Sequence, residues 1–258
     1  MEATLPWALA AILAVVSVYA ASFGWRERRR RRGRPLFDRS PVRLVDPCEI
    51  DPVFAVTELG PIRDSEVALI GDAGAHASTS TTEAWILCAL ARRARTIFEF
   101  GTCTGRTTYL LARNAPTDAV IATITLSPET VAAYRPDPSD PDSAHWAEIA
   151  RGESVYRSFY YEGTEVARKV QQILGDSKAF DETPWAGRCD LVFVDGSHAY
   201  SYVKNDSEKA LRMARPGGFV IWHDFSPDCA GVWRYLNELG RTRELLHIRG
   251  TRLAVARV

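Results

Sequence analysis

The sequence E-F-G-T-C-T-G-R-T, residues 99–107, joins a short apolar run to a polar segment with helical character. The run Thr96–Phe100 is typical of a strand that is buried on both faces of a sheet. Gly101 and Gly105 permit a tight turn and a close approach of the backbone to a ligand, although such turns also occur for purely structural reasons. The N-terminus of the following helix would offer free N–H groups to a carboxylate or phosphate.

Segments with strand and helix character alternate over about 190 residues around this turn. The alternation predicts an α/β fold with a doubly wound, mostly parallel sheet and helices on both faces. In such a sheet the ligand lies beyond the carboxyl ends of the strands, where the strand order reverses. The expected further strands are Ala119–Leu126, Cys189–Val194, Gly218–Trp222, Leu245–Ile248 and Leu253–Val258. One expected helix begins in the hydroxyl-rich stretch 78–83, and the others are Thr107–Asn114, Glu165–Leu174, Tyr200–Ala214 and Ala230–Leu239. An insertion or lid is expected between Ser127 and about Ser154.

The N-terminal 25 residues differ in character from the rest of the chain. Ala3 to Trp25 are uncharged, and 23 helical residues at about 1.5 Å each could cross a hydrocarbon core of about 30 Å. The Arg-rich run 26–34 that follows favours a single-pass helix with the N-terminus outside and the following domain in the cytoplasm. Arg residues of this run could also contact anionic lipid head groups. A cleaved secretory signal is the alternative, but the positive charge follows the apolar run instead of preceding it.

Charge is distributed unevenly along a chain whose formal net charge is zero. Residues 1–43 hold nine Arg and three acidic residues, so they carry +6 and the remainder carries −6. A domain of that sign is a poor candidate for binding nucleic acid. The five Cys include no C-x-x-C pair, which favours free thiols in a reducing compartment. We therefore divide the chain into an anchor at 1–25, an Arg-rich and Pro-rich linker at 26–61 and one domain at 62–258.

Four motifs resemble those of one enzyme family. Residues 98–107 are similar to motif I of the class I S-adenosylmethionine-dependent methyltransferases, particularly the catechol and macrolide-sugar O-methyltransferase-like branches. The stretch L-G-D-S at 174–177 resembles the adenine-side motif of these enzymes. D-L-V-F-V-D-G-S-H at 190–198 and R-P-G-G-F-V-I-W-H-D at 215–224 resemble two later motifs, in the same order. The resemblance covers about residues 80–225 and implies a Rossmann-like sheet.

The same resemblance implies where S-adenosylmethionine binds. The methionine part would lie at Glu99 and the glycine turn, and adenine would lie near residues 176 and 177. The family usually has an acid after the second strand for the ribose hydroxyls, and Thr125 stands there instead, without charge-assisted bidentate bonding. The implied cofactor-binding residues are Glu99, Gly101, Thr102, Gly105, Thr125, Asp176 and Ser177.

A second implied site follows the strand at 189–194. The resemblance makes Asp195, His223 and Asp224 ligands of a divalent metal, most simply magnesium, or manganese, iron or zinc if His223 coordinates. It makes His198 the general base, and an ordinary imidazole titrates near neutral pH, as that role requires. Alternatively, His198 caps the next helix or is merely exposed, and the two acids bind loop N–H groups.

These residues lead to a function hypothesis with one main rival. The resemblance implies S-adenosylmethionine-dependent O-methylation of a small-molecule, sugar or lipid-linked hydroxyl. The rival is a membrane-tethered protein that retains the cofactor fold without catalysis, because Thr125 and His223 depart from the family pattern. A dinucleotide enzyme is disfavoured because Cys103 replaces the middle Gly of G-x-G-x-x-G. The sequence does not select an acceptor and leaves open a homo-oligomer.

Overall fold

A computed structural model describes residues 13–14, 16–25, 40–74, 79–140 and 143–258. Its centre is an eight-stranded sheet in the order β1-β9-β10-β8-β7-β4-β5-β6. Five of these strands, from β8 to β6, are parallel to one another. The parallel strands are β4 (Thr96–Phe100), β5 (Val120–Thr125), β6 (Val170–Leu174), β7 (Cys189–Val194) and β8 (Ala214–Trp222). The predicted α/β class and Rossmann-like sheet are confirmed.

The remaining strands extend the sheet beyond β8. Strand β10 (Ala254–Arg257) pairs antiparallel with β8, and β9 (Leu246–Ile248) pairs antiparallel with β10. Strand β1 (Arg43–Val45) adds a parallel edge next to β9. Because the chain leaves β4 toward β6 and returns to β7, the strand order reverses between β4 and β7. A ligand is expected beyond the carboxyl ends of these two strands.

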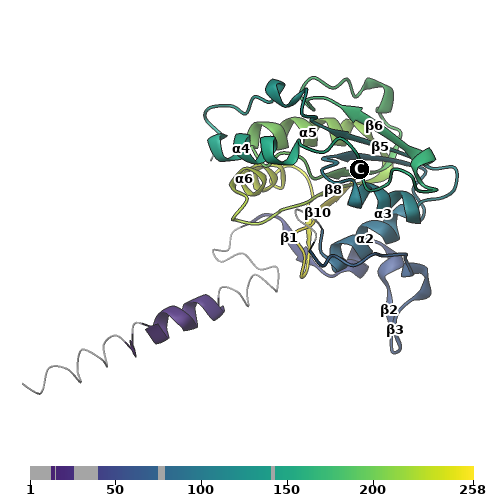
Figure 1. Ribbon diagram of the computed structural model, residues 1–258. Coiled ribbons are helices and arrows are strands. Elements are labelled where there is room, and N and C mark those ends of the chain that lie inside the picture. The colour runs from purple at the N-terminus through teal and green to yellow at the C-terminus, as the bar shows by residue number, and fades with distance from the viewer. Residues whose placement is uncertain (1–12, 15, 26–39, 75–78, 141–142) are drawn as a thin grey trace, which may run out of the picture.

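Helices cover both faces of the sheet (Figure 1). Helices α2 (Thr81–Ala91) and α3 (Arg106–Asn114) bury apolar side chains against one face. Helices α5 (Tyr200–Met213) and α6 (Ala230–Leu239) do the same on the other face. Helix α4 (Ser143–Glu153) lies within the predicted insertion and packs near the start of α5.

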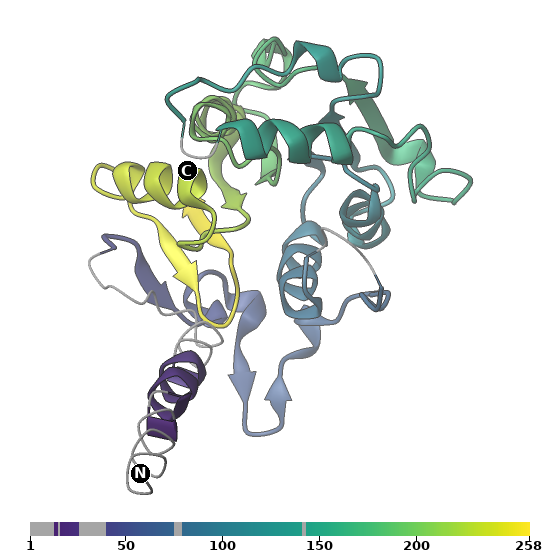
Figure 2. The same cartoon turned by 60° about the vertical axis from the view of Figure 1, so that its left-hand side comes forward.

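Short elements complete the described part of the chain. Strands β2 (Val56–Thr57) and β3 (Gly60–Pro61) form a hairpin that projects from the domain (Figure 2). Single 3-10 turns connect the longer elements. They are Pro47–Glu49, Pro52–Phe54, Arg63–Ser65, Val131–Ala133, Ala167–Lys169 and Thr183–Trp185.

Two sequence predictions need correction. The helix expected at 165–174 is wrong, because Val170–Leu174 form β6 and pair in parallel with Ile121–Thr125. The apolar spacing fits a helix, but pairing with the free edge of β5 determines the structure. Within the expected linker 26–61, Arg43–Val45 form a sheet strand, and their parallel partner lies about 200 residues away in the sequence. No local pattern could reveal that pairing.

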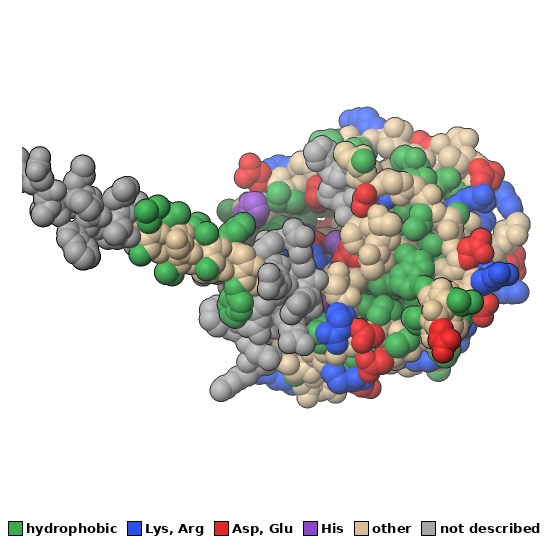
Figure 3. Space-filling model, turned by 90° about the horizontal axis from the view of Figure 1, so that it is seen from below, with side chains coloured by type: hydrophobic (Ala, Val, Ile, Leu, Met, Phe, Trp, Pro, Cys, Tyr) green, Lys and Arg blue, Asp and Glu red, His purple; other side chains and the backbone are tan. Residues whose placement is uncertain are grey.

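The predicted membrane segment lies partly outside the described residues, which include only 13–14 and 16–25 of it. These residues are helical, and most of their side chains are exposed. Among the helices that the structure describes, none combines the length and the apolar character needed to cross a membrane. Figure 3 shows hydrophobic side chains along this helix, whereas charges of both signs are interspersed over the domain.

Candidate active site

The carboxyl ends of β4 and β7 meet at Gly101 and Asp195. The Asp195 N–H donates to the Phe100 carbonyl at 2.8 Å, so the two strands remain paired to their last residues. Gly101 has a φ of +99°, and a Cβ atom there would lie 2.0 Å from the Asp195 carbonyl oxygen. Only glycine fits this position. The close backbone approach that the structure shows here is to the neighbouring strand of the same chain, and the predicted approach to a ligand stays a prediction.

An open cleft enclosing about 710 Å³ lies beyond these strand ends. Parts of β4, β5, the turn after β6, the loop after β7 and helices α4 and α5 form its walls. Four of the seven predicted cofactor-binding residues line this cleft, as do both residues predicted to act after β7. The lining residues among the predicted ones are Gly101, Thr125, Asp176, Ser177, Asp195 and His198.

Glu99 lies behind the glycine turn and is fully buried. Its Oε2 accepts hydrogen bonds from the hydroxyls of Thr108 and Thr123, the latter at 2.7 Å. Its Oε1 is buried without a hydrogen-bond partner. Burial raises the pKa of Glu99 to about 8, although the two hydroxyls oppose that rise. The carboxyl group is therefore neutral at pH 7 and would ionise beside a cationic ligand.

The other residues of the turn have different roles. The Thr102 hydroxyl is buried and shares a hydrogen bond of 2.7 Å with Thr123, so its side chain faces the core instead of the cleft. Gly105 has a φ of +78°, and a Cβ atom there would lie 2.9 Å from Cβ of Phe159. Both residues shape the turn, and only their backbone could contact a ligand. Thr125 lines the cleft at the end of β5, where the ribose acid was expected.

The predicted adenine-side residues are held by helix α5. The Tyr202 hydroxyl donates to Asp176 Oδ2 at 2.9 Å. Asp206 is a buried carboxylate of α5 that lines the cleft near Ser177, and burial raises its pKa to about 6. Lys209 Nζ donates to the Ser177 carbonyl at 2.7 Å. The sequence interpretation missed these α5 residues, although their spacing along one face of a helix was visible.

His223 joins the carboxylates of the second predicted site. Its Nδ1 lies 3.1 Å from Asp195 Oδ1 and 3.0 Å from Asp224 Oδ2. Its Nε2 lies 3.4 Å from Glu83 Oε2, a contact that the sequence did not reveal. Burial opposes the protonation of His223, but the surrounding carboxylates raise its pKa well above the usual value. All three predicted metal ligands are therefore brought together, with a cationic imidazole between the two carboxylates.

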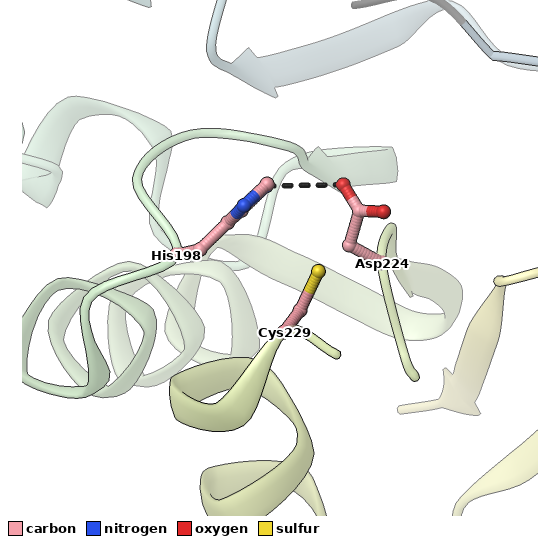
Figure 4. A group of neighbouring side chains, drawn as sticks. All are labelled: His198, Asp224 and Cys229. Carbon is pink, nitrogen blue, oxygen red and sulfur yellow. Dashed lines mark ion pairs between the residues drawn. The ribbon is translucent and has the colours of Figure 1, made fainter. Parts of the chain in front are cut away.

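His198 extends from the loop after β7 toward the Asp224 carboxylate, which also contacts His223 (Figure 4). Its Nε2 lies 3.0 Å from Asp224 Oδ2, and its Nδ1 is buried without a partner. Burial opposes protonation, but the hydrogen bond to Asp224 raises the pKa of His198 to about 10. The expectation that this ring titrates near neutral pH is therefore wrong for this arrangement. At neutral pH the ring is an imidazolium paired with a carboxylate.

Asp224 also contacts a third cationic side chain, that of Arg252. Arg252 Nη1 donates to Asp224 Oδ1 at 2.8 Å, and its Nη2 donates to Asp228 at 2.6 Å. Burial alone would raise the pKa of Asp224, but hydrogen bonds from both histidines hold it well below the usual range. Arg252 follows the turn between β9 and β10 and was absent from the sequence prediction. Its 28-residue separation from Asp224 leaves no local signal.

The predicted metal ligands have a donor set that fits a divalent cation. One ligand atom from each of Asp195, His223 and Asp224 lies within 4.8 Å of the others. Two carboxylates and one imidazole suit manganese, iron or zinc better than an all-oxygen magnesium site. A bound cation would replace the proton that His223 now holds between the carboxylates.

Helix α4 supplies a wall of the cleft that the sequence indicated only as an insertion. The Trp146 ring lies 4.7 Å from the His198 ring in an edge-on arrangement. Glu153, at the end of α4, lines the cleft and carries a pKa that burial raises. A flat aromatic surface and an acid therefore face the space next to His198.

Comparison with known proteins identifies the domain. The profile of a protein family described as "Methyltransferase domain" matches residues 98–225. The chain belongs to this methyltransferase family. The matched region begins in β4 and ends just after Asp224, so it contains both the glycine turn after β4 and the His198–Asp224 pair. No curated protein sequence matches the chain.

Solved structures similar to this methyltransferase are distant in sequence. A cofactor-bound protein from MTB is 21% identical, with a TM-score of 0.47, and the match covers 84% of this chain and 99% of that one. The O-methyltransferase TomG from Streptomyces achromogenes, solved with SAM, is 23% identical, with coverages of 70% and 81% and a TM-score of 0.45. An O-methyltransferase from Bacillus cereus, solved with SAH, is 19% identical, with coverages of 70% and 83% and a TM-score of 0.46. The roles of residues in this methyltransferase are therefore argued from its own geometry.

Proposed function

We propose that this methyltransferase transfers a methyl group from S-adenosylmethionine to a hydroxyl group of a small-molecule, sugar or lipid-linked acceptor. The observation that carries the proposal is a single cleft with two chemically distinct ends. One end is the glycine turn after β4 and the residues that follow β6. The other end is the His198–Asp224 pair beside Asp195.

The first end suits the cofactor. The buried Oε1 of Glu99 needs a donor, which the cofactor's amino group could provide near the turn at Gly101. Asp176 and Ser177, held by Tyr202 and Lys209, would receive adenine. Thr125 lines the cleft where the ribose would lie and can accept one hydrogen bond.

The second end suits proton removal from an acceptor hydroxyl. His198 would take the proton as the oxygen attacks the sulfonium methyl group in line, so positioning contributes much of the rate. The imidazolium state of His198 prevents this until the ring loses its proton. A divalent cation held by Asp195, His223 and Asp224 would neutralise the carboxylate that keeps His198 protonated and would lower the pKa of the acceptor hydroxyl.

Binding and turnover experiments separate this proposal from its rival, a cofactor-binding protein without catalysis. The full chain should bind S-adenosylmethionine or its demethylated product in calorimetry. It should also transfer a labelled methyl group to at least one hydroxyl acceptor in a chemically diverse panel, with and without added manganese or magnesium. Binding without transfer across the panel would favour the rival, and absence of binding at millimolar cofactor would contradict both.

We also propose that the N-terminal segment attaches the enzyme to a membrane, with the domain in the cytoplasm and the preceding residues outside. The uncharged run and the Arg-rich run after it support this topology. In the described part of the helix, Val18, Tyr19 and Phe23 are 62–72% exposed, and apolar side chains at such exposure favour lipid contact. A reporter fused after Val258 should be cytoplasmic, and the protein should resist extraction by high salt and alkali. A shortened, exported form would instead indicate a cleaved signal.

A further inference from the structure

The thiol of Cys229 lies beside the His198–Asp224 pair and has no part in the function proposed above. We propose that His198, Asp224 and Cys229 form a binding site for a soft divalent cation of the zinc class. Filling this site engages the ring that methyl transfer needs, so the cation inhibits the enzyme. The binding claim is independent of the proposed function, whereas the inhibition rests on it.

Three separate elements bring these donors together (Figure 4). His198 follows β7, Asp224 follows β8, and Cys229 immediately precedes α6. One ligand atom from each lies within 4.8 Å of the others. The His198 Nε2 and Asp224 Oδ2 are already 3.0 Å apart, and the Cys229 sulfur lies beside them. Small side-chain rotations would therefore bring all three donors onto one ion.

The direction of the thiol is the second observation. Cys229 is the N-cap residue of α6, a position where a side chain usually accepts a hydrogen bond from the helix. Its side chain makes no such cap hydrogen bond. The residue is only 6% exposed, and its sulfur faces His198 and Asp224. The thiol is thus held toward the two other donors instead of toward its own helix.

The backbone around the site is tightly fixed. A Cβ atom on Gly231, in the first turn of α6, would lie 2.2 Å from the His198 carbonyl oxygen. Helix α6 and the His198 loop are therefore in direct backbone contact, which holds Cys229 and His198 in register. Ligands fixed by rigid elements lose little entropy when they bind an ion.

The donor types select the class of cation. A thiolate, an imidazole and a carboxylate match zinc and other thiophilic ions, whereas magnesium prefers oxygen ligands alone. Coordination would release the thiol proton and the His198 proton to solvent. Arg252 lies 2.8 Å from Asp224 Oδ1 and 3.9 Å from the Cys229 sulfur, so its charge weakens the site without occupying Oδ2. A modest affinity that responds to cation concentration is the expected result.

Cadmium binding tests the site without any assay of activity. The full chain, reduced and metal-free, is titrated with Cd²⁺ while the near-ultraviolet thiolate-to-cadmium charge-transfer band is recorded. One equivalent should produce the band, and zinc should displace it. Cys229→Ser should weaken binding by more than about tenfold, and His198→Ala should also weaken it. Serine is a favoured N-cap residue, so Cys229→Ser is expected to fold.

Two other cysteines provide matched controls. Cys48 is exposed and Cys103 lines the cleft, so Cys48→Ser and Cys103→Ser test surface and cleft thiols. Both variants should retain the band. The proposal is overturned if the band is lost in Cys103→Ser and kept in Cys229→Ser, or if His198→Ala binds like the wild type. X-ray absorption of the zinc-loaded protein should show one sulfur ligand, and oxygen and nitrogen ligands alone would also overturn it.

Inhibition is measured separately, as the ratio of methyl transfer with and without zinc in each protein. The wild type should lose activity as zinc fills the site, and Cys229→Ser should need more than about tenfold more zinc for the same loss. Equal sensitivity of both proteins would overturn the regulatory claim. If no acceptor is methylated but the Cys229-dependent cadmium band appears, the proposed function fails while the metal site stands.

Discussion

The Asp195 carbonyl oxygen lies 2.0 Å from the point that a Cβ atom on Gly101 would occupy. This relationship links the turn after β4 to the residue that begins the acidic end of the cleft. The glycine is required by the fold itself, before any ligand binds. A substitution at Gly101 therefore acts on the pairing of β4 and β7 as well as on the cofactor.

The first prediction is that Gly101→Ala destabilises the protein by roughly 3–5 kcal/mol, because a positive φ and an overlap with backbone are added together. Gly163→Ala is the matched control, since Gly163 has a φ of +72° and nothing within 4 Å of its added Cβ. Gly163→Ala should lower the free energy of unfolding by only about 1–2 kcal/mol. Urea denaturation without cofactor measures both values. Equal losses would mean that the Asp195 contact is unimportant.

Much of this fold is predictable from local sequence. Buried parallel strands such as Thr96–Phe100 and Cys189–Val194 are mostly apolar runs, and their bounds match the structure. The helix at Ala230–Leu239 also matches, because its apolar residues recur at helical spacing. The edge strands β6 and β1 were missed because each depends on a partner strand, not on its own pattern.

The site is only partly predictable, for a related physical reason. Asp195, His198 and Asp224 lie one to four residues after strands β7 and β8, and the carboxyl ends of parallel strands meet at one edge. Glu83 and Arg252 reach the same cluster from a helix and a distant turn, so only the tertiary structure reveals them. The protonation of His198 depends on its burial and on its hydrogen bond to Asp224, which only the tertiary structure reveals. The pKa of that ring was therefore beyond sequence reasoning.

The second prediction concerns His198. Replacing it with Ala should lower turnover by roughly 10²–10⁴-fold, the usual range for loss of a general base. Cofactor affinity should remain near the wild-type value, because the ring faces Asp224 and Trp146 instead of the glycine turn. His145→Ala, an exposed change on α4, is the control and should have little effect on either quantity. Normal turnover of His198→Ala from pH 6 to 9 would exclude this base.

The third prediction concerns a divalent cation at Asp195 and Asp224. Asp195→Asn and Asp224→Asn should each reduce methyl transfer about as much as an excess of chelator does. The double variant should be no worse than either single one, because one loss already dismantles the site. Manganese added after chelation should restore the wild type and not the variants. Full activity of both variants in chelator would rule out a metal role.

The last prediction uses the protonation of Glu99. Its pKa near 8 in the free protein means that the carboxyl group is protonated at pH 6.5. The cofactor's ammonium group, fully charged at that pH, would favour the carboxylate, so binding should release close to one proton from Glu99. Affinity should then fall as the pH drops below 8, by at most about tenfold per unit. Calorimetry in two buffers with different ionisation enthalpies measures the proton release, and Glu99→Gln should abolish it while the fold is retained. Proton uptake by the wild type, or unchanged release in Glu99→Gln, would place the ammonium group away from Glu99.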